Sequence, residues 1–186
     1  MVTALLDAGV GVDINRPDTD GWAALHYAAH EGSEAVARAL MLRGVSTAVT
    51  TRCWGGSGGG GLAGHRPQLE GVRRDEPWVA QPLHVAAISG KAGVVRLLVQ
   101  HGVDVDARVA GTEHYGPTAL RMALHVGGIG LLAEEFGHEY LEVAQALVEA
   151  GADVSGVADG FTMEHVLKFK GYEDLWDKLR VGILTK

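Results

Sequence analysis

One pattern of residues occurs three times along this chain, and it limits the folds that the chain can adopt. The three segments begin at Ala23, Gln81 and Thr118 and read AALHYAAHEGSEAVARALMLRGVS, QPLHVAAISGKAGVVRLLVQHGVD, and TALRMAL with YLEVAQALVEAGAD further on. Each has an Ala-rich run after a Leu, followed by apolar residues at helical spacing, and so predicts two short helices with one apolar face each. Such a helix pair cannot bury its apolar face alone, so the repeats must stack on one another.

Local residues mark where these helices begin and end. Pro82 suits the first position of a helix, where its missing N–H costs nothing. Gly90 and Gly102 occupy positions where a helix ends in a left-handed residue, which strains any residue with a side chain. The sequence therefore predicts one helix from Pro82 to just before Gly90 and a second that ends before Gly102.

The segment from Gln81 to Ala107 resembles an ankyrin repeat. QPLHVAA differs from the Thr-Pro-Leu-His opening of that family only at Gln81, and HGVDVDA is similar to the family's ending. The resemblance implies an all-α fold, an ankyrin-repeat solenoid of stacked helix-turn-helix units with projecting finger loops.

The resemblance extends over nearly the whole chain. It predicts one array: a partial unit at 1–15, units at 16–49, 73–107 and 108–155, and a capping unit at 156–186. The half unit at the start favours a fragment of a longer array. The third unit has an excess of 12 residues, which we expect around HVGGIGLLAEEFGH, between its two helices.

The first two full repeats are separated by a Gly-rich insert, predicted at residues 50–72. Its composition is typical of a flexible linker. Added loop length costs only about 0.6 kcal/mol per doubling. The array is therefore expected to remain stacked across the insert.

His26 and His84 occupy matching positions, three residues after the start of each segment. A histidine there can hydrogen-bond the backbone at the helix start, where N–H groups lack partners. A catalytic or metal-binding role would need a second ligand or an acid partner at matching spacing. We therefore interpret both histidines as structural.

Other possible sites fail on their chemistry. Residues 55–61, GGSGGGG, and 126–130, VGGIG, lack the Lys-Ser or Lys-Thr of a phosphate-binding loop. Cys53 with His65, and His125 with His138, supply only two ligands each and lack the spacing of structural zinc motifs. We expect no catalytic residue, no cofactor and no metal, and hence no enzyme.

Charge and composition narrow the partners. The net charge of −7 would repel a phosphate backbone, and no apolar run approaches the length of a membrane span. One cysteine favours a reducing compartment. We expect a monomeric, soluble protein of the cytoplasm or nucleus that binds neither nucleic acid nor membrane.

A protein-protein interaction module is the function that remains. In the resembling family, partners contact the finger tips and the exposed end of the first helix. Aromatic residues at the fingers are candidate anchors, although they could instead pack flat on the next finger. The alternative function is a regulatory or substrate-targeting fragment of a larger enzyme, such as a kinase or ubiquitin ligase. The positions carried over are Thr19, Asp20, Trp22, His30, Glu31, Pro77, Trp78, Ile88, Ser89, His114, Tyr115, Pro117 and His125.

Overall fold

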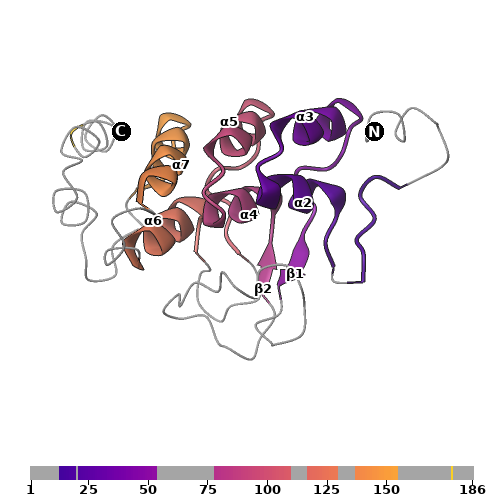
Figure 1. Cartoon of the computed structure of the whole chain (residues 1–186), viewed down its shortest axis with the longest axis horizontal. Coiled ribbons are helices and arrows are strands. Elements are labelled where there is room, and N and C mark those ends of the chain that lie inside the picture. Colours follow the sequence, from indigo (N-terminus) through magenta and orange to yellow (C-terminus); the bar gives the residue numbers. More distant parts are fainter. Residues whose placement is uncertain are drawn as a thin grey trace.

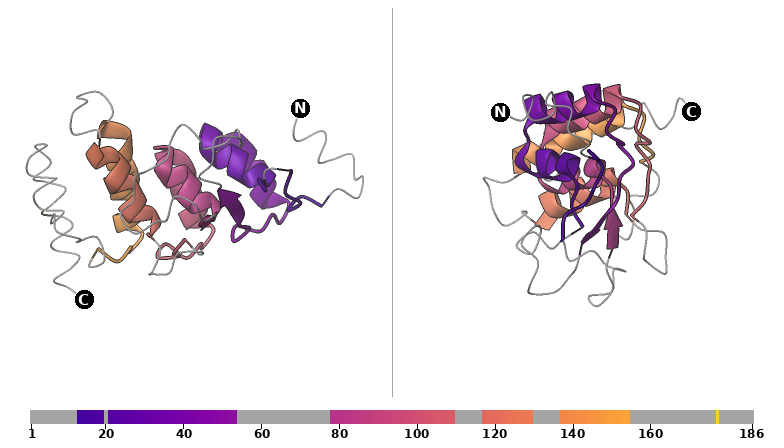
Figure 2. Two further views of the ribbon diagram at one scale, coloured as in Figure 1. Left: turned by 90° about the horizontal axis from the view of Figure 1, so that it is seen from below. Right: turned by 90° about the vertical axis from the view of Figure 1, so that its right-hand side faces the viewer.

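A computed structural model of the chain describes residues 13–19, 21–53, 78–109, 117–129, 137–154 and 177. Within these residues the helices form three consecutive pairs. The first helices lie in one row, the second helices lie in a row beside it, and the finger segments extend from the first row away from the second (Figures 1 and 2). The predicted stack of paired helices is thereby confirmed. The pairs are α2 (Ala24–Glu31) with α3 (Glu34–Leu42), α4 (Pro82–Ile88) with α5 (Ala92–Gln100), and α6 (Ala119–Ile129) with α7 (Gly137–Glu149).

One continuous apolar core runs through the three pairs. The Leu near the start of each first helix, at Leu25, Leu83 and Leu120, is almost fully buried. Burying a side chain of this size contributes about 1.5 to 3 kcal/mol. Because α4 contacts both α2 and α6, and α5 contacts both α3 and α7, much of this burial lies between pairs. Each pair is thus stabilised by its neighbours.

The helix boundaries follow the local residues as predicted. Pro82 is the first residue of α4. Gly90 and Gly102 have φ of 69° and 75°, in the left-handed region that favours glycine. Glycine at these two positions ends α4 and α5 without backbone strain.

A short antiparallel ribbon is the one departure from an all-helical structure in the named elements. Strand β1 (Thr51–Cys53) pairs with β2 (Trp78–Ala80), and Cys53 lies opposite Trp78. The segment between them, residues 54–77, therefore starts and ends at adjacent points, which is why α2 and α4 still contact each other. The insert was predicted at residues 50–72, and the structure places its residues 51–53 in β1.

The third helix pair absorbs its extra residues differently from the prediction. Helix α6 has 11 residues against 7 in α4, and α7 has 13 against 9 in α5. The helices thus extend into the stretch HVGGIGLLAEEFGH from both sides, and 130–136 remain between them. The prediction that the whole excess lies between the helices was wrong, because part of it lengthens α6 and α7. A residue added to the end of a helix gains a backbone hydrogen bond within that helix.

Hydrogen bonds between successive finger turns link the repeats. The Asn15 side chain accepts the backbone N–H of Ser46 at 2.7 Å, and the Asp106 side chain accepts that of Asp153 at 2.7 Å. Ala48 occupies the matching position in the finger between them and has no side-chain acceptor. The joint between the first two repeats therefore lacks a link that the joints on either side possess.

We expect Ala48→Asn to restore this link by accepting the backbone N–H of Asp104, the counterpart of Ser46. Ala48 is exposed, so the larger side chain meets no core. One added hydrogen bond should raise the free energy of unfolding by about 0.5 to 1 kcal/mol, measured by urea denaturation. Ala48→Leu, which has similar size but no acceptor, should give no gain; an equal gain from both variants would contradict the hydrogen-bond explanation.

Other predicted parts cannot be compared with the structure. The partial unit at 1–15 is described only from Asp13, and the capping unit at 156–186 only at Asp177. These unit boundaries remain predictions.

Candidate functional site

His84 anchors the start of α4 rather than taking part in chemistry at the surface. Its side chain is fully buried. Nδ1 accepts the backbone N–H of Gln81 at 3.2 Å, and Nε2 lies 2.8 Å from the carbonyl oxygen of Ala107, to which it donates. Burial lowers the pKa of His84 to about 4, against the smaller opposing effects of the Ala107 carbonyl and the Asp104 charge. These bonds join the helix to its own finger and support the structural interpretation.

His26 repeats half of this arrangement. Its Nδ1 accepts the N–H of Ala23 at 3.2 Å, and its ring is also fully buried. Nε2 has no hydrogen-bond partner of good geometry, although the carbonyls of Ala80 and Val49 are near enough to raise the pKa. Burial outweighs them and lowers the pKa of His26. The first repeat is therefore less firmly tied to its finger than the second.

The start of α6 uses different residues for the same task. Arg121 stands where His26 and His84 stand in the other repeats. Instead the Thr118 side chain accepts the backbone N–H of Arg121 at 3.3 Å. A threonine hydroxyl at this position satisfies one of the N–H groups that a helix start leaves without a partner.

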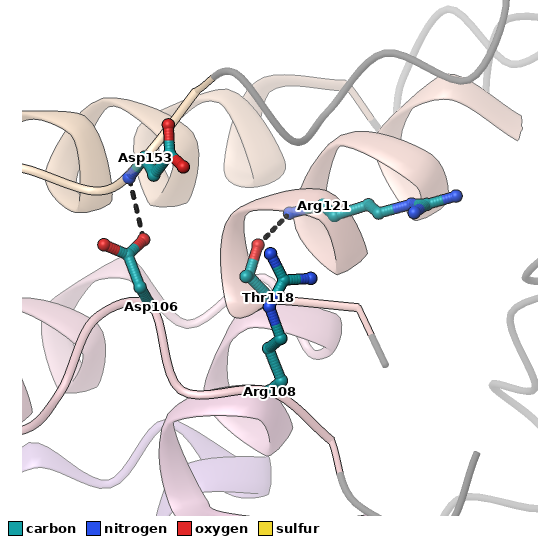
Figure 3. Close-up of a pocket in the computed structure, with 5 residues that line it drawn as sticks. All are labelled: Asp106, Arg108, Thr118, Arg121 and Asp153. Carbon is teal, nitrogen blue, oxygen red and sulfur yellow. Dashed lines mark hydrogen bonds between the residues drawn. The ribbon is translucent and has the colours of Figure 1, made fainter. Parts of the chain in front are cut away.

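A pocket of about 80 Å³ lies beside this helix start, between the second and third repeats (Figure 3). Its walls come from two finger turns and from the first turn of α6. Both signs of charge are present on them. The lining residues are Asp106, Arg108, Thr118, Arg121 and Asp153.

An aromatic cluster joins the finger before α2 to that helix. The Trp22 ring lies 5.0 Å from the ring of Tyr27 and 5.8 Å from that of His30, between ring centroids. The Asp18 carboxylate contacts both residues: it accepts the backbone N–H of Trp22 at 2.8 Å and the hydroxyl of Tyr27 at 2.5 Å. Tyr27 keeps 44% of its surface exposed, whereas Trp22 keeps 5%. The exposed aromatic is thus Tyr27, held in place from two sides.

Several residues predicted to contact a partner do lie at the surface. Thr19 is exposed, and Glu31 keeps 71% of its side chain exposed at the end of α2. His30 is partly exposed at 27% and lies 3.2 Å from Glu31, between Nδ1 and Oε1. Ser89 is half-buried, and its hydroxyl is buried without a hydrogen-bond partner.

Three predicted contact residues are buried, so the expectation that they are exposed is wrong. Trp22 packs under Tyr27 and His30, and Ile88 is fully buried in the core. Pro117 is buried next to the Arg108–Thr118 bridge between the finger and α6. Neighbouring elements cover each of these residues. The position of a residue within one repeat does not show this cover.

The remaining predicted residues cannot be judged by exposure. Trp78 lies in β2 and His125 in α6, by backbone only. Asp20, Pro77, His114 and Tyr115 lie outside the described residues.

Among the described residues, no group of three or more His, Cys, Asp or Glu side chains is placed to hold a metal ion. None of the helices in the described ranges combines the length and the apolar character needed to cross a bilayer.

Sequence reasoning missed Tyr27 and the pocket. Tyr27 lies within α2, whereas the aromatic anchors predicted from the sequence lie in the fingers. The pocket had a signal in the sequence, because Arg121 breaks the His26 and His84 pattern.

Comparison with known proteins agrees with this geometry. The ankyrin repeat family model matches residues 20–52, which include α2, α3 and most of β1, and residues 81–109, which include α4 and α5. A search of the curated proteins gives no match. Ankyrin repeats are generally protein-interaction modules and are typically non-catalytic. The stacked helix pairs and the family match together show that residues 20–52 and 81–109 are ankyrin repeats.

Proposed function

We propose that this chain binds another protein through its inner face, defined as the fingers together with the exposed side of α2, and that it catalyses no reaction. The observation that carries the proposal is Tyr27, a large aromatic side chain that remains 44% exposed although Asp18 and Trp22 fix its position. Tyr is among the residues that most often dominate binding energy. A side chain that is already ordered loses little entropy when a partner covers it.

The charges around Tyr27 indicate what the partner presents there. Asp18, Thr19 and Glu31 are exposed on the same part of the inner face, and the chain has a net charge of −7. Complementary charge speeds association and selects partners. The partner surface opposite Tyr27 is therefore expected to be basic or rich in hydrogen-bond donors.

Affinity capture with matched variants tests this proposal. We expect Tyr27→Ala to weaken binding of the captured partner by about 30-fold, the effect of losing about 2 kcal/mol at a hot spot. Tyr27→Phe keeps the ring and should lose much less. Arg96→Ala alters an exposed residue of the second-row helix α5 and serves as the control.

Circular dichroism of each variant establishes that it is folded before binding is compared. If Arg96→Ala weakens binding as strongly as Tyr27→Ala, the outer row carries the partner and the proposal fails. The cytoplasmic or nuclear location, the monomeric state and a targeting role within a larger enzyme remain predictions.

A further inference from the structure

The second-row helices α3 and α5 carry a surface that the proposed function does not use. They lie in the upper row of Figure 1, on the side away from the fingers. Leu42, the last residue of α3, keeps 76% of its surface exposed. Arg38 is exposed one helical turn earlier, so the two side chains adjoin on one side of the helix. A single exposed leucine is ordinary, and the residues around it decide whether it belongs to a site.

The matching positions of α5 extend this surface into the next repeat. Counted back from the glycine that follows each helix, Arg96 corresponds to Arg38 and Gln100 to Leu42. Both residues are exposed, and α5 packs against α3. Packed helices lie about 8 to 10 Å apart, so one bound segment can reach both guanidinium groups. We call Arg38, Leu42, Arg96 and Gln100 the outer patch.

Contacts within the protein do not neutralise the two arginines. Neither Arg38 nor Arg96 forms an ion pair or a side-chain hydrogen bond with any residue that the structure describes. Glu34, the acidic residue of α3, is directed to α5: its carboxylate lies where a side chain on Gly93 would begin. The partial positive charge at the start of α5 favours a carboxylate in that place. The outer patch therefore presents two cations beside an apolar side chain.

The third repeat shows where the outer patch ends. In α7 the same two positions hold Gln145 and Glu149. The Gln145 amide donates a hydrogen bond to the Glu149 carboxylate at 2.8 Å. These two side chains bond each other and carry a negative charge in place of a positive one. The outer patch is thus confined to the first two described repeats.

The charge of the outer patch selects an acidic ligand. Carboxylates pair with guanidinium groups through two parallel hydrogen bonds, and Leu42 offers apolar surface beside them. The net charge of −7 repels an extended polyanion, whereas a short acidic segment of a protein meets only the local charges. We propose that the outer patch binds a protein segment with two acidic residues and one large apolar residue. This surface is separate from the inner face and takes a different partner.

Random peptide display against the full chain is the probe, and fluorescence anisotropy then measures each selected peptide. We expect one family of peptides to carry two acidic residues and a large apolar residue. Arg38→Glu and Arg96→Glu should each weaken binding of this family at least about tenfold, because a like charge then faces a carboxylate. Leu42→Ala should weaken it about fivefold to tenfold through lost apolar burial.

Two variants serve as controls, and far-UV circular dichroism establishes that every variant is folded. Arg16→Glu changes the net charge by the same amount at an exposed finger residue, and should alter binding less than about threefold. Tyr27→Ala should leave binding of these peptides unchanged. Since Arg96→Ala should likewise leave the partner captured through Tyr27 unaffected, the two proposals can fail separately.

The proposal is overturned if no family of selected peptides depends on both arginines, if the dependent peptides are not acidic, or if Leu42→Ala leaves their binding unchanged. Vesicles of equal parts phosphatidylserine and phosphatidylcholine, and duplex DNA, test the other anionic ligands. If either binds the wild type and loses that binding in Arg38→Glu, the outer patch serves a polyanion, and the proposal of a protein segment is rejected.

Discussion

Trp22→Ala should lower the free energy of unfolding by about 3 kcal/mol or more, as large-to-small changes at buried aromatic residues do. Trp22 is 5% exposed and packs against the rings of Tyr27, His26 and His30. Its removal would leave a cavity and would release Tyr27 and His30 from one side. Aromatic pairs of this geometry add about 0.5 to 1.5 kcal/mol beyond the area that they bury.

Urea unfolding followed by far-UV circular dichroism measures this effect without relying on the fluorescence of the deleted residue. Thr19→Ala, in the same finger and exposed, should change stability by less than about 0.5 kcal/mol. A loss below 1 kcal/mol for Trp22→Ala would mean that the indole is exposed as the sequence suggested. It would also return Trp22 to the candidate binding residues.

Trp22 illustrates which parts of this protein can be predicted from sequence. The helix ends at Gly90 and Gly102 and the start at Pro82 were predictable because each depends on its own backbone angles. The burial of Trp22 was not, because it depends on Tyr27 and His30 one to two helical turns later. The positions of residues within the finger do not show how much of Trp22 the side chains of α2 cover.

The pocket shows the opposite case, in which the sequence alone distinguishes the repeat that carries it. Aligning His26, His84 and Arg121 identifies the one repeat without the ring. What the alignment cannot provide is the position of Asp106 and Arg108, which come from the preceding repeat and reach the pocket only through stacking. Contacts across repeats require the three-dimensional spacing of neighbouring units.

The histidines also make stability depend on pH, and this is the second large expected effect. Above the unfolded-state pKa of about 6.5, His84 is neutral in both states and its contribution is fully present. Below that pH the unfolded chain binds a proton that folded His84, with its pKa lowered to about 4, does not bind. Unfolding then takes up a proton, so the free energy of unfolding falls as the pH falls from about 6.5 to 4.

The size of this loss follows from the shift. Each pH unit between the two pKa values costs about 1.4 kcal/mol, which gives about 3 kcal/mol for His84 by pH 4. His26 acts in the same direction, since burial lowers its pKa as well. The loss from His84 alone is a large fraction of the roughly 5 to 15 kcal/mol by which a small domain is stable.

His84→Gln separates this effect from general acid unfolding. The amide can still accept the Gln81 N–H and donate toward Ala107, but it cannot titrate. We expect the variant to be less stable than the wild type near pH 7 and to lose about 3 kcal/mol less between pH 6.5 and 4, in urea titrations across that range. His101→Gln, which removes an exposed histidine after α5, should keep the wild-type dependence. His84→Gln could instead lose stability on acidification as steeply as the wild type. In that case the ring of His84 is not buried as a neutral group, and the bonds that join α4 to its finger do not set the acid sensitivity of the stack.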